Sequence, residues 1–319
     1  MRMSRFFLIL LAVPALALAQ AFPSRQLSIV VPYSPGSTSD LIPRAIAPLL
    51  AQSLGQPVIV DNRPGAGGNI GAAAVAKGDP SGHTVLMAPS AILATNQWLY
   101  KDMPFDPGAD LTPVINAAST PNMIVVHPSV QASNIRSLIE LARAKPGTLS
   151  FASGGNGTTS HLCGELLKTT AKVDLVHIPY KGPAPALQDV LAGRVPMMCD
   201  NFSNVIQHVR QGRLKPIALT ALKRHAQAPE VPTAHESGLP NFEIGVWYGF
   251  AVPSGTPKPV VQKLNSEIAK ALKDPATAER LKTLGLDIVA DSPEHFAKFV
   301  AAESEKMKKL VRESGARID

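Results

Sequence analysis

Two short turns rich in glycine and hydroxyl residues have the composition of an anion-binding site. Residues 32–40 read PYSPGSTSD and follow a β-rich apolar run, and residues 153–161 read SGGNGTTSH. In each turn glycine permits a sharp bend, and Ser or Thr stands where a helix begins. A helix N-terminus offers free N–H groups and partial positive charge, so it binds anions without Lys or Arg. The hydroxyls could simply cap their helices, but two such turns together predict a two-sided clamp for an anion.

Side chains beyond these turns could complete the site. Tyr180 follows a short strand, and Asp200 ends an apolar one. Asp200 could cap the next helix or meet a cationic group of a ligand, and Lys181 could supply a cation or be solvated. The ligand-binding residues predicted so far are Ser34, Gly36, Ser37, Thr38 and Ser39 in the first turn, Ser153, Asn156, Gly157, Thr158, Thr159 and Ser160 in the second, and Tyr180 and Asp200.

Other motifs give weaker signals, and we predict no cofactor, no metal and no catalytic residue. Residues 65–71 read GAGGNIG, but a dinucleotide-binding fingerprint requires Gly-x-Gly-x-x-Gly directly after a strand. No Gly-x-Ser-x-Gly, Cys-x-x-Cys or His-Glu-x-x-His spacing occurs. A hydrolase using Ser160, His161 or Cys163 stays open as an alternative, although the sequence spacing identifies no general base that would activate such a nucleophile.

Composition indicates a folded, exported protein. The chain has 319 residues, 45% hydrophobic and 17% charged, with a net charge of +7 that is scattered along it. Only 5% of residues are aromatic, which disfavours stacking platforms for sugars or single-stranded nucleic acid. Two basic residues, a short apolar run and Ala17-x-Ala19 form a predicted signal peptide over residues 1–21. Export permits a disulfide between Cys163 and Cys199, but both lie in apolar surroundings and could be buried thiols.

The elements that must position these turns alternate between strand and helix. Strands are expected over residues 27–31, 58–60, 84–87, 123–127, 149–152, 176–178, 195–199, 217–220 and 246–252. Helices are expected over residues 40–54, 70–77, 135–145, 158–169, 184–192, 204–211, 258–272, 275–284 and 293–313. This order predicts an α/β fold with mostly parallel sheets flanked by helices. We expect two lobes, 22–120 plus 246–319 and 121–245, with the chain crossing between them twice.

Taken together, these segments resemble the substrate-binding receptors of the tripartite tricarboxylate transporter family, also called the Bordetella uptake gene (Bug) type. The resemblance covers nearly all of the chain after residue 21. It rests on VVPY at 30–33, LGQPV at 54–58, DNRPGAGGNIG at 61–71, IPYKG at 178–182 and WYG at 247–249. The family usually has Pro-Pro-Gly-Gly where this chain has Ser34-Pro35-Gly36-Ser37, so the ligand's identity does not follow from a relative.

The resemblance implies a two-lobed periplasmic binding protein of the Venus flytrap type II architecture. Such a receptor holds small carboxylates, typically di- or tricarboxylates or amino acids, and both predicted turns match the family's carboxylate-holding loops. The same matching adds Ser90 as a first-lobe donor. We expect a periplasmic monomer that presents its ligand to the inner-membrane subunits of a tripartite tricarboxylate transporter, without covalent chemistry. An orphan receptor that signals to a membrane sensor kinase is the other alternative.

Overall fold

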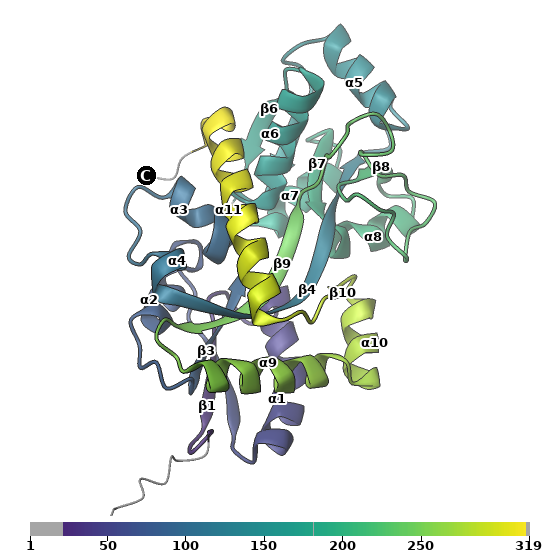
Figure 1. Ribbon diagram of the computed structural model, residues 1–319. Coiled ribbons are helices and arrows are strands. Elements are labelled where there is room, and N and C mark those ends of the chain that lie inside the picture. The colour runs from purple at the N-terminus through teal and green to yellow at the C-terminus, as the bar shows by residue number, and fades with distance from the viewer. Residues whose placement is uncertain (1–21, 181, 317–319) are drawn as a thin grey trace, which may run out of the picture.

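Parallel strands with helices between them form the two ends of the molecule, as the apolar pattern predicts. The computed structural model describes residues 22–180 and 182–316. The predicted signal peptide and Lys181 lie outside the described residues. Figure 1 shows one set of strands at the bottom and another at the top, with two long strands running between them.

The first strand group contains the N-terminal strands. β1 pairs in parallel with both β2 and β3, and β9 pairs antiparallel with β3. The strands are β1 (Leu27–Val31), β2 (Val58–Asn62), β3 (Thr84–Pro89) and β9 (Gly245–Pro253). One face packs against α1 (Thr38–Leu54), α9 (Lys258–Leu272) and α10 (Pro275–Thr283). The other meets α2 (Asn69–Ala76), η2 (Ala91–Thr95) and α3 (Asn96–Leu99). The short helices η1 (Ala66–Gly68) and α4 (Pro107–Asp110) lie beside η2.

The second strand group repeats this plan. β5 pairs in parallel with β6 and β7, and β4 pairs antiparallel with β7 and β8. The strands are β5 (Ser150–Ser153), β6 (Val176–Pro179), β7 (Met197–Asn201) and β8 (Lys215–Leu219). The helices are α5 (Ile135–Ala144), α6 (Thr159–Ala171), α7 (Pro183–Leu191) and α8 (Phe202–Arg210).

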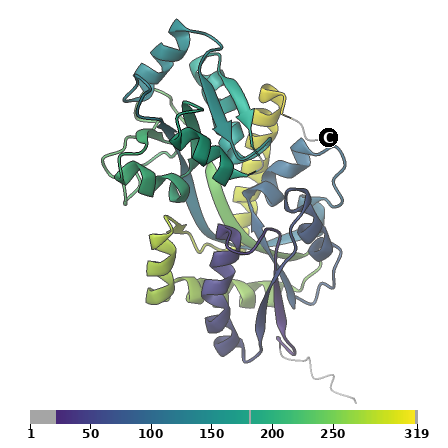
Figure 2. The ribbon, with the colours of Figure 1, turned by 180° about the vertical axis from the view of Figure 1, so that it is seen from behind.

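The strands β4 and β9 and the helix α11 connect the two groups. β4 (Leu111–Val126) pairs with β9 as far as Pro121 and with β7 from Asn122 onward. The short β10 (Asp287–Ile288) also pairs with β4. Helix α11 (Pro293–Ser314) packs against α6 on one side of the crossing and against η2 and α9 on the other. Figure 2 shows the same arrangement from behind, with β4 and β9 side by side in the centre.

β4 is the largest departure from the sequence-based elements. The apolar pattern predicts a strand only from Met123, but the structure has strand from Leu111. Its first part carries Asn116 and Thr120, and its pairing with β9 shifts register twice, so no regular alternation marks it. The α/β fold class predicted from the sequence is confirmed.

Helix α1 shows how local sequence fixes the position of a turn. Ile42, Ile46 and Leu50 recur at helical spacing and are buried against the sheet. The helix ends at Gly55, whose left-handed φ of 66° lets the chain leave the helix without steric strain. Burial of this face fixes the helix, so its N-terminal turn is held against the end of β1.

A disulfide joins Cys163 on α6 to Cys199 on β7. The two cysteines, which the sequence left as either bonded or free, are thus bonded. This bond holds the N-terminal half of α6 beside the middle of β7. Among the described helices, none is both long and apolar enough to cross a membrane.

Candidate functional site

Both sets of parallel strands point their carboxyl ends toward the crossing. β3 ends at Pro89, which lies opposite Tyr248 near the start of β9. β7 ends at Asn201, which lies opposite Asn122, the residue after the last β4–β9 pair. The turns that follow β1 and β5 therefore lie at the inner edges of their strand groups. Ligands of open α/β sheets bind at such edges.

The first turn is held from within by a buried carboxylate. The Gly36 N–H donates to Asp40 Oδ2 at 2.9 Å, and Arg44 Nε and Asn62 Nδ2 each donate to Asp40 Oδ1 at 2.9 Å. Burial alone would raise the pKa of Asp40, but these hydrogen bonds outweigh it and hold the pKa below its usual range. Ser37 is the N-cap residue of α1 but makes no capping hydrogen bond. The turn is thus rigid while the Ser37 hydroxyl stays available.

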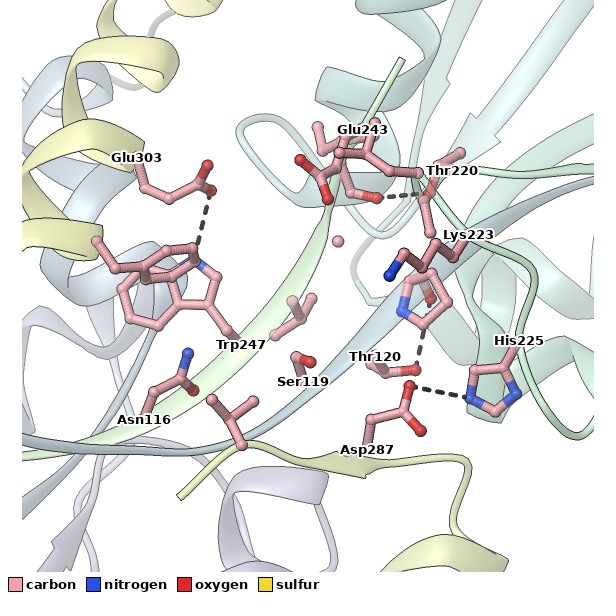
Figure 3. A pocket seen from close by; sticks show the side chains of 18 of the residues that line it. Asn116, Ser119, Thr120, Thr220, Lys223, His225, Glu243, Trp247, Asp287 and Glu303 are labelled. Atoms are coloured by element: carbon pink, nitrogen blue, oxygen red, sulfur yellow. Dashed lines mark hydrogen bonds and ion pairs between the residues drawn. The ribbon is translucent and has the colours of Figure 1, made fainter. Parts of the chain in front are cut away.

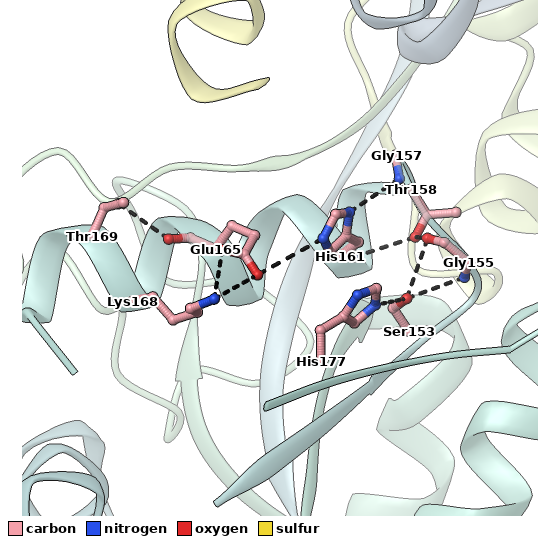
Figure 4. Close-up of polar contacts among 9 residues, drawn as sticks. All are labelled: Ser153, Gly155, Gly157, Thr158, His161, Glu165, Lys168, Thr169 and His177. Carbon is pink, nitrogen blue, oxygen red and sulfur yellow. Dashed lines mark hydrogen bonds and ion pairs between the residues drawn. The ribbon is translucent and has the colours of Figure 1, made fainter. Parts of the chain in front are cut away.

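The second turn is built by capping hydrogen bonds (Figure 4). The Thr158 hydroxyl donates to the Gly155 carbonyl at 2.8 Å and accepts the His161 N–H at 3.3 Å. The Gly157 N–H donates to His161 Nδ1 at 3.1 Å. Because the Thr158 hydroxyl is engaged in both directions, it shapes the turn more than it offers a free donor. A backbone N–H paired to a side chain four residues later occurs in both turns, at Gly36 and at Gly157.

A stacked histidine pair lies beneath the second turn. The rings of His161 and His177 are 4.0 Å apart, and His177 Nε2 lies 2.7 Å from the Ser153 hydroxyl. Burial is the main reason why the pKa of both imidazoles is lowered to about 4. The positive charge of Lys168 lowers both pKa values further. His161 Nε2 lies 3.8 Å from Glu165. The pair is therefore neutral at neutral pH, and His161 Nδ1 is already occupied by the Gly157 N–H.

Tyr248 on β9 senses polar groups of both strand groups. The pKa of the Tyr248 phenol responds both to the Thr38 hydroxyl, which lowers it, and to the Asp200 carboxylate, which raises it. Burial, rather than Asp200, is the main reason why the pKa of Tyr248 is raised. Tyr248 is therefore electrostatically coupled to the start of α1 and to the end of β7. The sequence analysis missed Tyr248 as a site residue, because nothing in its apolar strand distinguishes it from a core residue.

Several buried polar atoms around the crossing have no hydrogen-bond partner among the described residues. Three of them are hydroxyl oxygens: that of Ser37 at the start of α1, that of Ser160 at the start of α6 and that of Ser203 at the start of α8. Asn122 lies at the crossing itself, and both atoms of its side-chain amide are without a partner. An unpaired buried polar group costs free energy, so such atoms in one region indicate a ligand that completes them. The sequence analysis missed Asn122 and Ser203.

The remaining predicted residues are distributed around the same edges. Ser34 and Asn156 are exposed at the tips of the two turns, whereas Ser39 and Ser90 are buried at the starts of α1 and η2. Thr159 is the first residue of α6. The Tyr180 hydroxyl donates to Asp189 at 2.6 Å, so this hydroxyl is committed to α7.

A separate cavity of about 580 Å³ lies beside the crossing (Figure 3). We call it the hinge cavity; its walls include Asn116, Lys223, His225, Trp247, Asp287 and Glu303. None of the predicted ligand-binding residues lines it. Several of its ionisable groups lie opposite one another: Lys306 beside Glu303, His295 beside Asp291, and His225, whose pKa is lowered by burial, 3.5 Å from Asp287. We therefore place the candidate site at the two turns rather than in this cavity.

The glycine-rich segment 65–71 has a packing role. The Gly67 carbonyl accepts hydrogen bonds from Tyr33 and Asn96, and a Cβ at Gly71 would lie 2.7 Å from the Arg63 carbonyl. These glycines let the segment fit tightly against neighbouring backbone and side chains. Within residues 22–180 and 182–316, no group of three or more His, Cys, Asp or Glu could hold a metal.

Comparison with known proteins identifies the family. A family model described as tripartite tricarboxylate transporter family receptor matches residues 42–316. The protein encoded between tcbD and tcbE in Pseudomonas sp. strain P51 is 43% identical over 92% of this chain and 87% of its own length. Protein BugT of Bordetella pertussis is 36% identical over 94% of this chain and 92% of its own.

Solved structures agree with this assignment. Rpa4515 of R. palustris, solved with adipate, superposes with a TM-score of 0.82 at 35% identity, covering 93% of this chain and 99% of its own. MatC of Rhodopseudomonas palustris, solved with bound malate, gives a TM-score of 0.78 at 32% identity, covering 91% of this chain and 100% of its own.

Proposed function

Because this chain belongs to the family of tripartite tricarboxylate transporter receptors, we propose that it captures a small carboxylate between its two strand groups. The family consists of periplasmic receptors, not enzymes, that bind small carboxylates and work with membrane subunits of the transporter. The ligand of this chain is a di- or tricarboxylate or an acidic amino acid. The observation that carries this proposal is the set of unpartnered buried hydroxyls at helix N-termini on both sides of the crossing.

The proposed contacts follow from the negative charge of the ligand and the partial positive charge of the helix N-termini. Each carboxylate of the ligand accepts hydrogen bonds from free N–H groups at the start of α1 or α6 and from Ser37 or Ser160. Arg44 does not take part, since its guanidinium is used by Asp40 and Asn62. Asp40 and His161 hold the two turns in position, so little entropy is lost when the ligand binds.

After the ligand binds, the two lobes close around it. The lobes correspond to residues 22–120 plus 246–319 and to residues 121–245, and they approach each other by bending β4 and β9 at the crossing. The closed monomer, exported by its N-terminal signal peptide, is then presented to inner-membrane transporter subunits. A receptor that signals to a membrane sensor kinase would use the same site, and the two roles differ only in the membrane partner.

The hydrolase alternative lacks support from the site. Cys163 is bonded to Cys199 and is not a free nucleophile. His161 accepts the Gly157 N–H at Nδ1 and faces Glu165 with Nε2, so no free nitrogen is directed at Ser160.

A thermal-shift screen followed by calorimetry tests the proposal. The purified chain without its first 21 residues is screened against mono-, di- and tricarboxylates and amino acids. A ligand at 100 times its Kd stabilises the folded state by about 2.7 kcal/mol, which is easily measured. Stabilisation by at least one organic acid is expected. No response to the whole panel, together with turnover of an ester or amide, would refute the proposal.

A further inference from the structure

The hinge cavity lies on the face of β4 and β9 that is turned away from α1. Ser119 and Trp247 are partners across these two strands, and both line the cavity. The neighbouring pair, Ala118 and Tyr248, packs instead in the hydrophobic core that includes the buried face of α1. Alternate residues of a strand point to opposite faces, so the cavity is separate from the turn that begins α1. Its volume of about 580 Å³ is that of a typical small-molecule site.

The cavity contains a buried polar atom that no described residue satisfies. Asn116 is 3% exposed and lines the cavity, and the Oδ1 atom of its side-chain amide has no hydrogen-bond partner. Figure 3 shows this side chain pointing from β4 toward Trp247. An amide oxygen only accepts hydrogen bonds, and leaving one unpaired in the interior costs free energy. A ligand that completes Asn116 must therefore bring a hydrogen-bond donor.

The charged side chains around the cavity favour a positive ligand. Within the described chain, its walls carry four carboxylates and three Lys or Arg side chains, but Arg224 Nε donates to Glu236, outside the cavity, at 2.7 Å. Burial lowers the pKa of His225, so this ring adds no positive charge at neutral pH. Even with a proton on His295, the carboxylates outnumber the remaining cations, and their field attracts a positive group. The carboxylates are those of Glu243, Asp287, Asp291 and Glu303, and the lysines are Lys223 and Lys306.

Much of the remaining wall is aromatic or aliphatic. Trp247 is buried, and the Phe299 ring packs edge-on against its indole, with the ring centres 5.4 Å apart. Leu222 and Val289 also line the cavity but stay 44% and 38% exposed, so they lie at its mouth. An indole ring attracts an ammonium group, and the apolar side chains gain free energy by burying a hydrocarbon group. The wall therefore suits a ligand that combines the two.

We propose that the hinge cavity is a second ligand site, which binds a small primary amine with an aromatic or aliphatic group. The ammonium donates to Asn116 Oδ1 beside Trp247, and the surrounding carboxylates balance its charge. The hydrocarbon group packs against Phe299, Leu222 and Val289. This ligand has the opposite charge from the one proposed for the two turns, so the inference goes beyond the proposed function and does not rest on it.

Three probes test the ligand class on the chain without its first 21 residues. 2-Phenylethylamine carries both features, 2-phenylethanol lacks the positive charge, and methylamine lacks the hydrocarbon group. Calorimetry at pH 7.5 and low ionic strength, where charges are least screened, should give at least tenfold tighter binding for 2-phenylethylamine than for either of the others. No binding of 2-phenylethylamine, or equal binding of the alcohol, would overturn the inference.

Variants test where the amine binds. Asn116→Leu removes the acceptor but nearly keeps the side-chain volume, and it should weaken binding of 2-phenylethylamine at least tenfold. Glu303→Gln removes a charge of the cavity wall and should weaken binding several-fold. Its control is Glu305→Gln on the same helix, where an exposed carboxylate outside the cavity is changed, and this variant should bind like the unmodified protein.

The carboxylate site provides a second control. Ser160→Ala should leave binding of 2-phenylethylamine unchanged, because Ser160 belongs to the second turn and does not line the cavity. Binding that survives both Asn116→Leu and Glu303→Gln, or that falls in Ser160→Ala, would refute the placement in the hinge cavity. If carboxylates bind but the amine does not, this inference fails and the proposed function stands; if the amine binds but no acid does, the reverse holds.

Discussion

At the scale of single residues, the site divides its hydroxyls into two kinds. The Thr158 hydroxyl is saturated by capping hydrogen bonds, so it contributes to the stability of the turn. The Ser37 and Ser160 hydroxyls are buried without a partner, so they lower stability until a ligand arrives. The composition of the turns predicts both kinds, but only the structure distinguishes them, because Ser and Thr can play either role.

The variant Ser160→Ala separates binding from stability. We expect carboxylate affinity to fall at least about tenfold, because a hydrogen bond to a charged group is lost. The unfolding free energy of the ligand-free protein should stay the same or rise, because an unpaired buried hydroxyl is removed. Calorimetry and urea unfolding measure the two quantities. Thr169→Ala, on the same helix but bonded to the Glu165 carbonyl, is the control and should leave affinity unchanged. Unchanged affinity in Ser160→Ala would argue against this contact.

The stacked histidines make stability depend on pH. Both have pKa values of about 4 in the folded protein, below the ordinary value of 6.5, so the unfolded chain binds protons more readily than the folded one. The free energy of unfolding that depends on these two histidines is fully present above pH 6.5 and is lost as the pH falls from 6.5 to about 4. Urea unfolding at intervals across this range should show a falling free energy of unfolding. The slope should be smaller in His177→Phe, which keeps an aromatic ring but does not titrate. An equal slope in both proteins would contradict this assignment.

At the scale of elements, the disulfide determines where two site elements meet. It joins α6, which carries Ser160, to the residue before Asp200. The sequence could not predict this bond, because residues 36 apart in apolar segments pair only if the fold brings them together.

Removing the disulfide should affect both stability and binding. The double variant Cys163→Ala/Cys199→Ala should lose about 2–4 kcal/mol of stability, because the unfolded chain is less constrained. Its carboxylate affinity should fall as well, since Ser160 and Asp200 are no longer held together. Urea unfolding and calorimetry provide the two values. A variant with lower stability but unchanged affinity would show that the bond has no role in positioning the site.

The elements themselves were largely predictable. Alternating apolar runs with Gly and Pro at their ends predict β1, β3, α1 and α6 to within a few residues, because these elements bury one regular face. The first part of β4 was not predictable, since its polar residues and register shifts break the alternation. The electrostatic influence of Asp200 on Tyr248 could not be predicted either, because it depends on how two distant strands meet at the crossing.

At the scale of the whole molecule, the crossing both joins the strand groups and forms the base of the site. β4 and β9 pass through it, and α11 packs against both groups. Ser304 on α11 accepts hydrogen bonds from Gln97 and Trp98, and Glu303 accepts one from Trp247. This helix therefore ties the first strand group to the crossing while it contacts α6 of the second.

A crystal structure of the chain with a carboxylate from the screen tests the central claim most directly. We predict carboxylate oxygens about 2.7–3.2 Å from the N-terminal N–H groups of α1 and α6 and from the hydroxyls of Ser37 and Ser160. A carboxylate held instead by Lys223 or Lys306 in the hinge cavity would contradict it.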